Sequence, residues 1–292
     1  MMMFNDQAAN LRRQMKKRHQ TKQAKTISVV SGKGGVGKSN FILNFAIKLS
    51  ERQQSVLILD LDIGMGNIDI LLGLQAKYSI VQMYENKWPI HDIIEKGPNS
   101  ISYIAAGSGL SEIFNQDDSM FDYFLEQFSE IINEYDYIFF DMGAGVTDVS
   151  LSYILATDEC FVVTTPEPTA MMDAYSMIKH IDQYNQELPF YLLINRVDST
   201  KEGKLVINRL QKVSEQFLAK SLTALGLVPF DKKVSKAVIA QVPFTLYDPA
   251  TKASRAVDQI ARQYLSDTIN LDKKRSSLFI HKLKSYITDN RS

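Results

Sequence analysis

Cysteine is almost absent from this chain of 292 residues, because Cys160 is the only one. A single cysteine cannot form an intrachain disulfide, and it excludes the paired-cysteine sites of zinc proteins and iron–sulfur carriers. Long apolar runs are also lacking, since no stretch reaches the roughly 18–20 residues needed to span a bilayer. No apolar segment of a secretory signal follows the basic first residues. We therefore expect a cytoplasmic protein.

Net charge is likewise absent, since 33 basic and 33 acidic side chains cancel. The distribution of charge is uneven: residues 1–25 carry +6 and residues 272–292 carry +4, which leaves −10 for the middle. Two basic ends around an acidic body are typical of interaction tails. No boundary rich in Pro, Gly or Ser divides the body. We predict a flexible extension over 1–25, one domain over 26–270 and a C-terminal segment over 271–292.

The most informative stretch is residues 27–40, ISVVSGKGGVGKSN. An apolar strand over 27–30 leads into a glycine-rich turn, and a segment with helical spacing follows. In this setting the pattern Gly-x4-Gly-Lys-Ser predicts a phosphate-binding loop, in which backbone N–H groups and a helix N-terminus hold phosphate oxygens. A turn that only links strand to helix would not need the whole pattern. We assign nucleotide binding to Gly32, Lys33, Gly34, Gly35, Val36, Gly37, Lys38, Ser39 and Asn40.

Further apolar strands are expected over 55–60, 101–105, 137–141, 160–165, 190–195 and 222–228. They alternate with helices expected over about 119–133, 170–184, 205–218 and 250–269. This alternation predicts an α/β fold with a mostly parallel, twisted sheet and helices on both faces. Ligands of such sheets bind at the carboxyl ends of the strands. Polar residues follow the expected strands there: Asp60, Asp62, Asp141, Thr164 and Asn195.

A second lysine, Lys33, stands near the start of the loop, although one lysine suffices to hold phosphate. KGGVGKS over 33–39 resembles the deviant Walker A motif of the MinD/ParA ATPases, which are P-loop NTPases with a MinD/SIMIBI-like fold. The resemblance implies ATP and Mg²⁺ as ligands and a homodimer in the ATP state. In that dimer Lys33 reaches the partner's nucleotide and neutralises charge during phosphoryl transfer. The alternative is a solvated loop lysine.

Two acidic segments fit the same family. LDLDIGMGNID over 59–69 resembles switch I, which implies that Asp60 holds magnesium through water and that Asp62 orients the attacking water. DMGAG over 141–145 resembles Walker B with switch II, and it implies a second water-mediated magnesium contact at Asp141. We therefore expect magnesium at Ser39, Asp60 and Asp141, and catalysis by Asp62, Lys33 and Lys38. An acidic loop at a strand end is the alternative for 59–69.

The base of the nucleotide is expected further along the chain. Asn195 and Arg196 end a strand and resemble the family residues that hydrogen-bond adenine, although Asn at a strand end is common in turns. The loop over 226–231 resembles the segment whose backbone lines the base, which adds Val228, Pro229, Phe230 and Asp231. Glu167, in a family-like loop, is either structural or reaches a partner's nucleotide.

The C-terminal segment carries apolar residues on one helical stripe with basic residues around it. This pattern is typical of an amphipathic helix on an anionic membrane surface, and it predicts peripheral membrane association in the ATP state. The alternative is a helix packed on the body, whose core-facing stripe has the same pattern. The membrane residues are expected to be Phe279, Ile280, Leu283, Tyr286 and Ile287, with Lys282 and Lys284 beside anionic lipid.

DQAANLR over 6–12 matches the DQAxxLR element of the FlhG family (YlxH/FleN), the MinD-like regulators of flagellar placement and number. The resemblance implies that the extension stimulates an FlhF-type GTPase, and that components of the flagellar C-ring at the basal body are further partners. The alternative is a disordered basic arm. The activating residues are expected to be Asp6, Gln7, Ala8, Leu11 and Arg12, with Gln7 and Arg12 contributing most.

These patterns together predict an ATPase switch that dimerises on ATP, associates with the membrane and controls flagellar placement and number. The alternative is a ParA-type partition ATPase whose basic surface binds nucleic acid non-specifically. Apolar residues among the basic ones of the tail favour lipid over nucleic acid, because contacts to phosphate do not need them. A ligase or synthetase on the same fold has no recognisable site for an acceptor substrate here.

Overall fold

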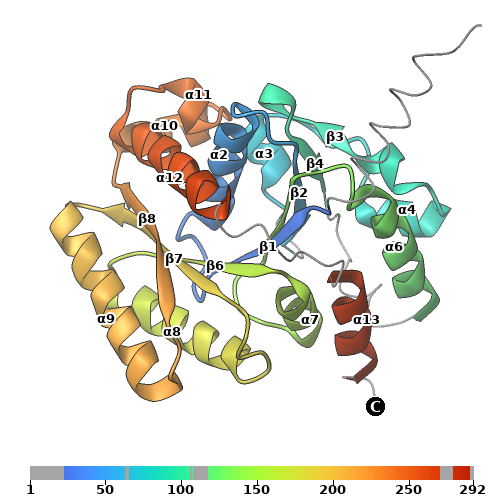
Figure 1. The fold of residues 1–292 in the computed structure, drawn as a ribbon. Helices are drawn as coiled ribbons and strands as arrows, with labels where there is room; N and C mark the ends of the chain where they lie inside the picture. The colour runs from blue at the N-terminus through green and yellow to red at the C-terminus, as the bar shows by residue number, and fades with distance from the viewer. Residues whose placement is uncertain (1–22, 63–65, 106, 108–117, 270–278, 290–292) are drawn as a thin grey trace, which may run out of the picture.

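The computed structural model describes residues 23–62, 66–105, 107, 118–269 and 279–289 (Figure 1). Within these residues the strands form one eight-stranded sheet in the order β3-β4-β2-β5-β1-β6-β7-β8. Neighbouring strands are parallel except β3 and β4, which are antiparallel. The predicted fold class is confirmed. The strands are β1 (Lys25–Val30), β2 (Val56–Leu61), β3 (Glu95–Lys96), β4 (Ser102–Ile104), β5 (Tyr137–Met142), β6 (Glu159–Thr164), β7 (Phe190–Val197) and β8 (Leu222–Pro229).

Helices cover both faces of the sheet (Figure 1). One face packs against α2 (Lys38–Ser50), α3 (Ile68–Leu72), α10 (Lys232–Ile239), α11 (Phe244–Tyr247) and α12 (Lys252–Ile269). The other face packs against α4 (Ile80–Asn86), α6 (Asp118–Ile131), α7 (Asp148–Ala156), α8 (Pro168–Asp182), α9 (Thr200–Leu218) and α13 (Phe279–Asp289). Two short 3₁₀ helices are η1 (Ile90–Ile93) and η2 (Pro98–Ser100).

The central strands are buried on both faces, which explains their nearly continuous apolar sequences. In β5, Ile138 and Phe140 belong to the core on the α7 side, whereas Tyr137 and Phe139 belong to the core on the α2 side. Alternate residues of a strand point to opposite faces, so one apolar strand serves two cores. Because the central strands are parallel, their carboxyl ends all lie at one edge of the sheet, where the polar residues gather.

Several helices were not expected from the sequence. Helix α7 is the clearest case: Leu151 to Ala156 are all buried, so the helix has no polar face and no amphipathic period. It begins with a capping box in which Thr147 accepts from the backbone N–H of Ser150 and the Ser150 side chain accepts from Thr147. The short helices α3, α4, α10 and α11 also lie outside the expected ranges.

The two edges of the sheet are irregular. At one edge β3 has only two residues and runs antiparallel to β4. At the other edge β8 pairs with β7 in a register that shifts twice, between Leu192 and Leu193 and between Asn195 and Val197. Helices α9 and α12 both contact β8.

None of the helices in the described part of the chain combines the length and the hydropathy that crossing a membrane requires.

Candidate functional site

The glycine-rich loop lies where the sequence places it, between the end of β1 and the start of α2. Gly37 precedes α2 with φ 93°, a left-handed conformation that favours glycine, and no side chain caps the first turn of the helix. Gly32 lies against α8, because a Cβ at this position would collide with the backbone of Asp173 and Ala174. The loop therefore offers uncapped N–H groups at a helix N-terminus, which is a site suited to an anion.

A buried ion pair lies at the base of the loop. The Lys38 ammonium donates to Asp141 Oδ1 at 2.6 Å, and both side chains are buried. The second carboxylate oxygen, Oδ2, is buried and has no hydrogen-bond partner among the described residues. An unsatisfied carboxylate oxygen in the interior is costly, so it is a natural acceptor for a bound water or cation. The predicted Walker A lysine and Walker B aspartate are thus brought together.

Asp60 is the last residue but one of β2, lies beside this pair and is 2% exposed. Its carboxylate accepts hydrogen bonds from the backbone N–H groups of Asp62, Asn67 and Ile68, at 2.8–3.2 Å. Burial, and next the charge of Asp141, raises the pKa of Asp60 to about 7 against those hydrogen bonds. A cation bound beside the buried Asp60 carboxylate would stabilise its ionised form.

Asp62 is only partly buried and faces the loop that follows β5. A Cβ built on Gly143 would lie 3.1 Å from Asp62 Oδ1. Burial raises the pKa of Asp62, the Lys38 charge lowers it and the Asp141 charge raises it further. The backbone N–H of Gly145 donates to Ser31 O at 3.4 Å, so both predicted switch segments touch the phosphate-binding loop or each other. Ile63 and Gly64 of the first switch lie outside the described residues.

Lys33 lies at the exposed rim of the loop. Its ammonium donates to Glu167 Oε2 at 3.0 Å and to Thr169 Oγ1 at 3.3 Å, both at the start of α8. Lys33 is therefore held by its own chain rather than pointing freely into solvent. The sequence left two roles open for Glu167, a structural one and contact with a partner's nucleotide. Its contact with Lys33 is a structural one.

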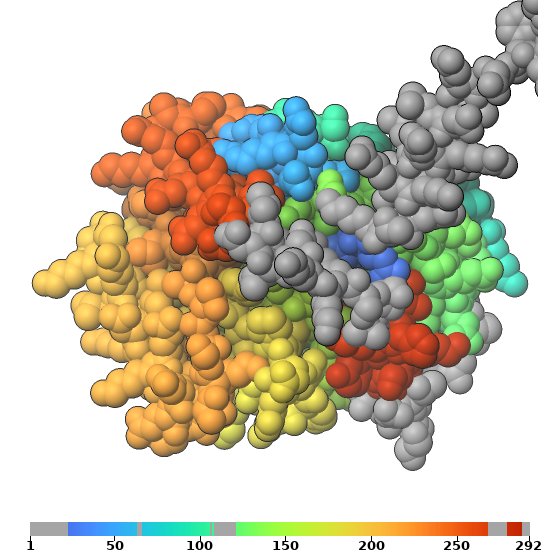
Figure 2. Space-filling view, in the orientation of Figure 1, coloured from blue at the N-terminus to red at the C-terminus, as the bar shows by residue number. Residues whose placement is uncertain are grey.

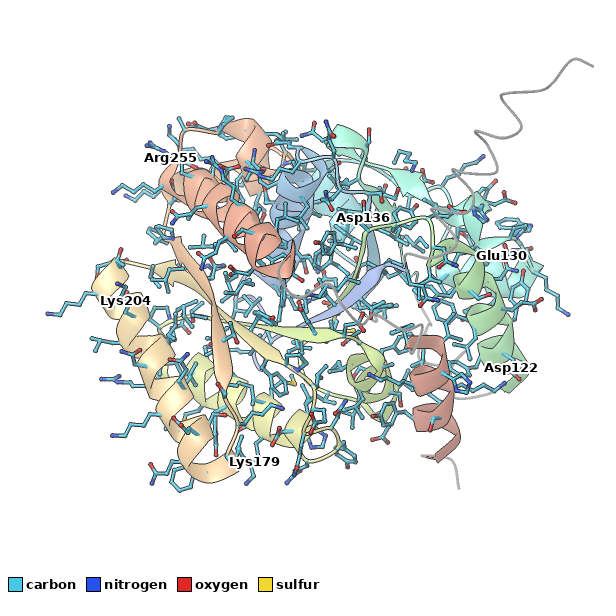
Figure 3. The ribbon with its side chains drawn as sticks, viewed as in Figure 1. Asp122, Glu130, Asp136, Lys179, Lys204 and Arg255 are labelled. Carbon is cyan, nitrogen blue, oxygen red and sulfur yellow. The ribbon has the colours of Figure 1, made fainter. Side chains whose placement is uncertain are left out.

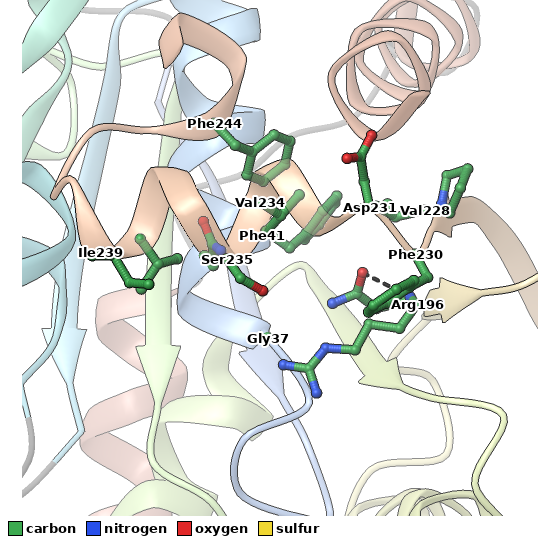
Figure 4. Close-up of a pocket in the computed structure, with 14 residues that line it drawn as sticks. Gly37, Phe41, Arg196, Val228, Phe230, Asp231, Val234, Ser235, Ile239 and Phe244 are labelled. Atoms are coloured by element: carbon green, nitrogen blue, oxygen red, sulfur yellow. Dashed lines mark hydrogen bonds between the residues drawn. The ribbon is translucent and has the colours of Figure 1, made fainter. Parts of the chain in front are cut away.

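Next to Gly37 a cavity of about 480 Å³ opens between α2, the ends of β7 and β8, and α10 (Figure 4). Its volume suits a compact ligand such as a nucleotide base with its sugar. Apolar side chains of α2 and α10 face Phe230 and Arg196 across it (Figure 4). All six residues predicted to contact the base line this cavity: Asn195, Arg196, Val228, Pro229, Phe230 and Asp231.

Two of these residues also have roles that the sequence did not predict. The Asn195 amide donates to Val36 O at 2.8 Å, so the end of β7 holds the phosphate-binding loop. Asp231 is the N-cap of α10 and accepts from the backbone N–H of Lys233 at 2.9 Å. Six further residues that line the cavity were not predicted: Phe41, Val234, Ser235, Val238, Ile239 and Phe244. The helical spacing of Val234 and Val238, directly after the loop over 226–231, is a sequence signal that could have found two of them.

The residues present fit a magnesium nucleotide. Ser39 lies in the first turn of α2, and Asp60 and Asp141 offer carboxylates nearby in the interior. No group of three or more His, Cys, Asp or Glu side chains within the described ranges could hold a metal alone. Magnesium usually keeps several waters and takes phosphate oxygens with one or two protein ligands, so the Ser39 hydroxyl and the two carboxylates suit it.

The predicted membrane helix is packed on the body. In α13, Phe279, Leu283 and Ile287 are buried, and Ile280 and Tyr286 are half-buried against the same core. The helix contacts α7 and α6, and it lies flush with the surrounding surface as dark red atoms in Figure 2. The alternative given for this segment, a helix packed on the body, therefore describes α13 in this structure. The stripe that would face lipid faces the core instead.

The basic residues of α13 are more accessible. Lys284 is exposed and pairs with Asp122 of α6 at 2.9 Å, at a position marked by Asp122 in Figure 3. Lys282 is half-buried. The expected activating residues Asp6, Gln7, Ala8, Leu11 and Arg12 lie outside the described residues, as do 271–278.

The sequence profile of the ParA family, described as NUBPL iron-transfer P-loop NTPase, matches residues 22–265. The antiactivator FleN of Pseudomonas aeruginosa is 33% identical over 237 residues, covering 81% of this chain and 85% of FleN. The flagellum site-determining protein YlxH of Helicobacter pylori is 29% identical over 280 residues, covering 90% of each chain.

A solved structure shares the fold. The septum site-determining protein MinD of Pyrococcus horikoshii, complexed with Mg-ADP, superposes with a TM-score of 0.67. It is 20% identical and covers 86% of this chain and 100% of its own. At this identity the likeness concerns the fold alone.

Proposed function

The chain belongs to the ParA family of P-loop NTPases, and from this premise we propose that it is a MinD-like ATPase switch regulating flagellar placement and number. The predicted MinD/ParA family, with FleN and YlxH among the relatives, is confirmed. The chain is a P-loop ATPase, as predicted, and ATP and Mg²⁺ are its ligands in this proposal. The iron transfer in the profile's description is not carried over, since Cys160 is the only cysteine and is buried.

The flagellar part of the proposal is supported by two relatives. FleN is named an antiactivator and YlxH a flagellum site-determining protein, and each aligns over at least 81% of this chain. The DQAANLR element over 6–12 points to the same group within the family. Output is spatial in this proposal: the nucleotide state decides where and how many flagella assemble.

One observation carries the ATPase part. Lys38 and Asp141 meet at 2.6 Å beneath an uncapped helix N-terminus, next to a cavity of base size. We assign Lys38 to the β- and γ-phosphates, and Ser39, Asp60 and Asp141 to magnesium, which when bound neutralises phosphate charge. Asp62 faces the loop over 143–145. In this proposal its carboxylate orients the attacking water.

We further propose an ATP-dependent homodimer in which Lys33 acts on the partner's nucleotide. Lys33 lies at the rim of the site and pairs with Glu167 through side chains that are 43% and 59% exposed. An exposed ion pair of this kind contributes about 0–1 kcal/mol, so it releases Lys33 at little cost. Contact between two subunits across this rim then brings Lys33 near the second site.

Membrane association is a proposal that the packing of α13 constrains. The apolar face of α13 is occupied by α6 and α7, so lipid contact requires the helix to leave the body. A helix that undocks in the ATP dimer would present two apolar faces and bind an anionic surface more tightly through effective concentration. In this proposal the protein is cytoplasmic in one nucleotide state and peripherally membrane-bound in the other.

The partner proposal concerns an FlhF-type GTPase, with flagellar C-ring components as further partners. We expect the full chain to accelerate GTP hydrolysis by the cognate GTPase, and a variant lacking residues 1–20 to lose the acceleration. The measurement is phosphate release by the GTPase at fixed concentration of each protein.

The matched control separates charge from sequence. Gln7→Ala with Arg12→Ala should abolish the acceleration. Arg13→Ala with Arg18→Ala also changes two residues of the extension, but both lie outside the DQAxxLR element, so this variant should retain the acceleration. Equal losses in the two pairs would mean that the extension acts as a basic arm, and no acceleration by the full chain would reject this partner.

A further inference from the structure

Asn44 of α2 is a polar side chain with no exposed surface, on a helix whose other fully buried residues are apolar. Both of its polar atoms are fully used. Its Nδ2 donates twice to Asn40, to the carbonyl oxygen at 2.8 Å and to Oδ1 at 3.0 Å. Its Oδ1 accepts twice from Thr245, from the backbone N–H and from the hydroxyl, each at 2.9 Å. Asn is a poor residue for a helix interior, so this network needs a reason.

The two partners of Asn44 belong to two helices that border the cavity. Asn40 lines it from α2, one residue after Ser39. Thr245 is buried in α11, and its neighbour Phe244 lines the cavity from that helix. Figure 4 shows Phe244 above Phe41 and Val234 at this wall. Ser254 of α12 holds the same segment by donating to Phe244 O at 3.1 Å and to Asp248 O at 2.8 Å.

We propose that Asn44 is a positioning residue that sets the width of the base cavity by joining α2 to α11, two helices that both line it. The proposal rests on the nucleotide site proposed above and assigns a role to a residue that touches no ligand itself. Two of the four hydrogen bonds of this amide join α2 to Thr245 of α11, so movement of α11 relative to α2 breaks both at once. The phosphate-binding loop is held separately, by Asn195 at Val36 O. Asn44 should therefore govern recognition of the base rather than of the phosphates.

The experiment compares two ligands that differ in the base. Thr245→Val removes the hydroxyl donor at nearly constant volume, and Asn44→Ala removes the whole network. Affinities for ATP and for inorganic triphosphate, both with magnesium, are measured by calorimetry on the full chain. Loss of one hydrogen bond predicts about a fivefold weaker affinity for ATP in Thr245→Val. We expect a larger loss in Asn44→Ala, inorganic triphosphate affinity within about twofold of wild type, and recovery in Thr245→Ser.

Thr157→Val is the matched control. Thr157 is also buried, and its hydroxyl donates to Ile154 O at 2.7 Å and lies 3.1 Å from Ser28 Oγ. It precedes β6 at the amino end of that strand, away from the cavity. It should lower the melting temperature without changing the affinity for either ligand.

Three outcomes overturn the proposal. They are equal loss of ATP affinity in Thr245→Val and Thr157→Val, parallel loss of ATP and triphosphate affinity, and wild-type ATP affinity in both Asn44→Ala and Thr245→Val. Failure of the wild type to bind ATP would instead reject the nucleotide site. If Asn44→Ala does not fold, the comparison of Thr245→Val with Thr245→Ser still tests the proposal.

Discussion

The docking of α13 can be weakened from the body side, leaving the helix itself unchanged. Phe279 of α13 stacks on Phe140, with ring centroids 5.0 Å apart, and meets Phe128 of α6 at 5.3 Å. Phe128→Leu removes the second aromatic contact and keeps an apolar side chain. Aromatic pairs contribute about 0.5–1.5 kcal/mol beyond the area they bury. The population with α13 undocked should then rise about two- to tenfold, since 1.4 kcal/mol corresponds to a factor of ten.

The assay is sedimentation with anionic vesicles in the absence of nucleotide, at low occupancy. If only undocked α13 binds lipid, the apparent affinity follows the undocked fraction, and binding should rise by the same two- to tenfold. Phe161→Leu is the matched control, because Phe161 is fully buried in the core on the other face of the sheet. It should cost stability without increasing the binding to vesicles.

The reasoning fails if Phe128→Leu binds vesicles no better than wild type, or if Phe161→Leu raises binding equally. In the first case α13 is a packing helix in every state, and in the second vesicle binding reports general unfolding. Phe279→Asp with Ile280→Asp, in contrast, should lower vesicle binding, because it places charge on the stripe that would face lipid once α13 has undocked.

Three further predictions concern the acidic and basic groups of the site. Asp62→Ala should bind ATP as wild type does but hydrolyse it at least about a hundredfold more slowly, since only the orientation of water is removed. Calorimetry measures the binding and phosphate release measures the hydrolysis, and normal turnover would contradict the assignment. Lys33→Ala in an Asp62→Ala background should bind ATP yet fail to dimerise in analytical ultracentrifugation, and an undiminished dimer would exclude its action on a partner. Asp60 has a pKa of about 7 in the folded state against 3.8 in the reference state, so the native state holds the proton more tightly and stability falls as pH rises between those values. Asp60→Asn should reduce the loss of melting temperature between about pH 5 and about pH 8 in the nucleotide-free protein, and an unchanged loss would contradict the assignment.

The strands and the nucleotide loop could be predicted because their signals are local. Apolar runs such as 137–141 and 190–195 are found as β5 and β7, and the glycine pattern lies in the strand–loop–helix setting that gives it meaning. The order of the strands could not be predicted, because pairing is decided by contacts between segments far apart in sequence. Burial on all sides removed the amphipathic period of α7, so this helix was missed.

Two parts of the site needed the three-dimensional structure. The stripe of α13 has one pattern for two partners, lipid or core, and only packing distinguishes them. Asn44 gives a weak local signal, a single amide among apolar residues, and its importance arises from Thr245, which lies 201 positions away. The base-binding loop was predicted by resemblance, whereas the other wall of the cavity depends on the helices α10 and α11, which the sequence did not reveal.

The irregular edges of the sheet limit how copies of the protein can aggregate. An edge strand with a regular, exposed ladder is a template for fibrils, whereas β3 is too short to add a strand of useful length and β8 is distorted by its register shifts. A high local concentration of the protein at one place in a cell therefore carries a reduced risk of open-ended strand addition. Crowding should favour finite complexes, and the carboxyl-end face can take part in them without competition from the edges.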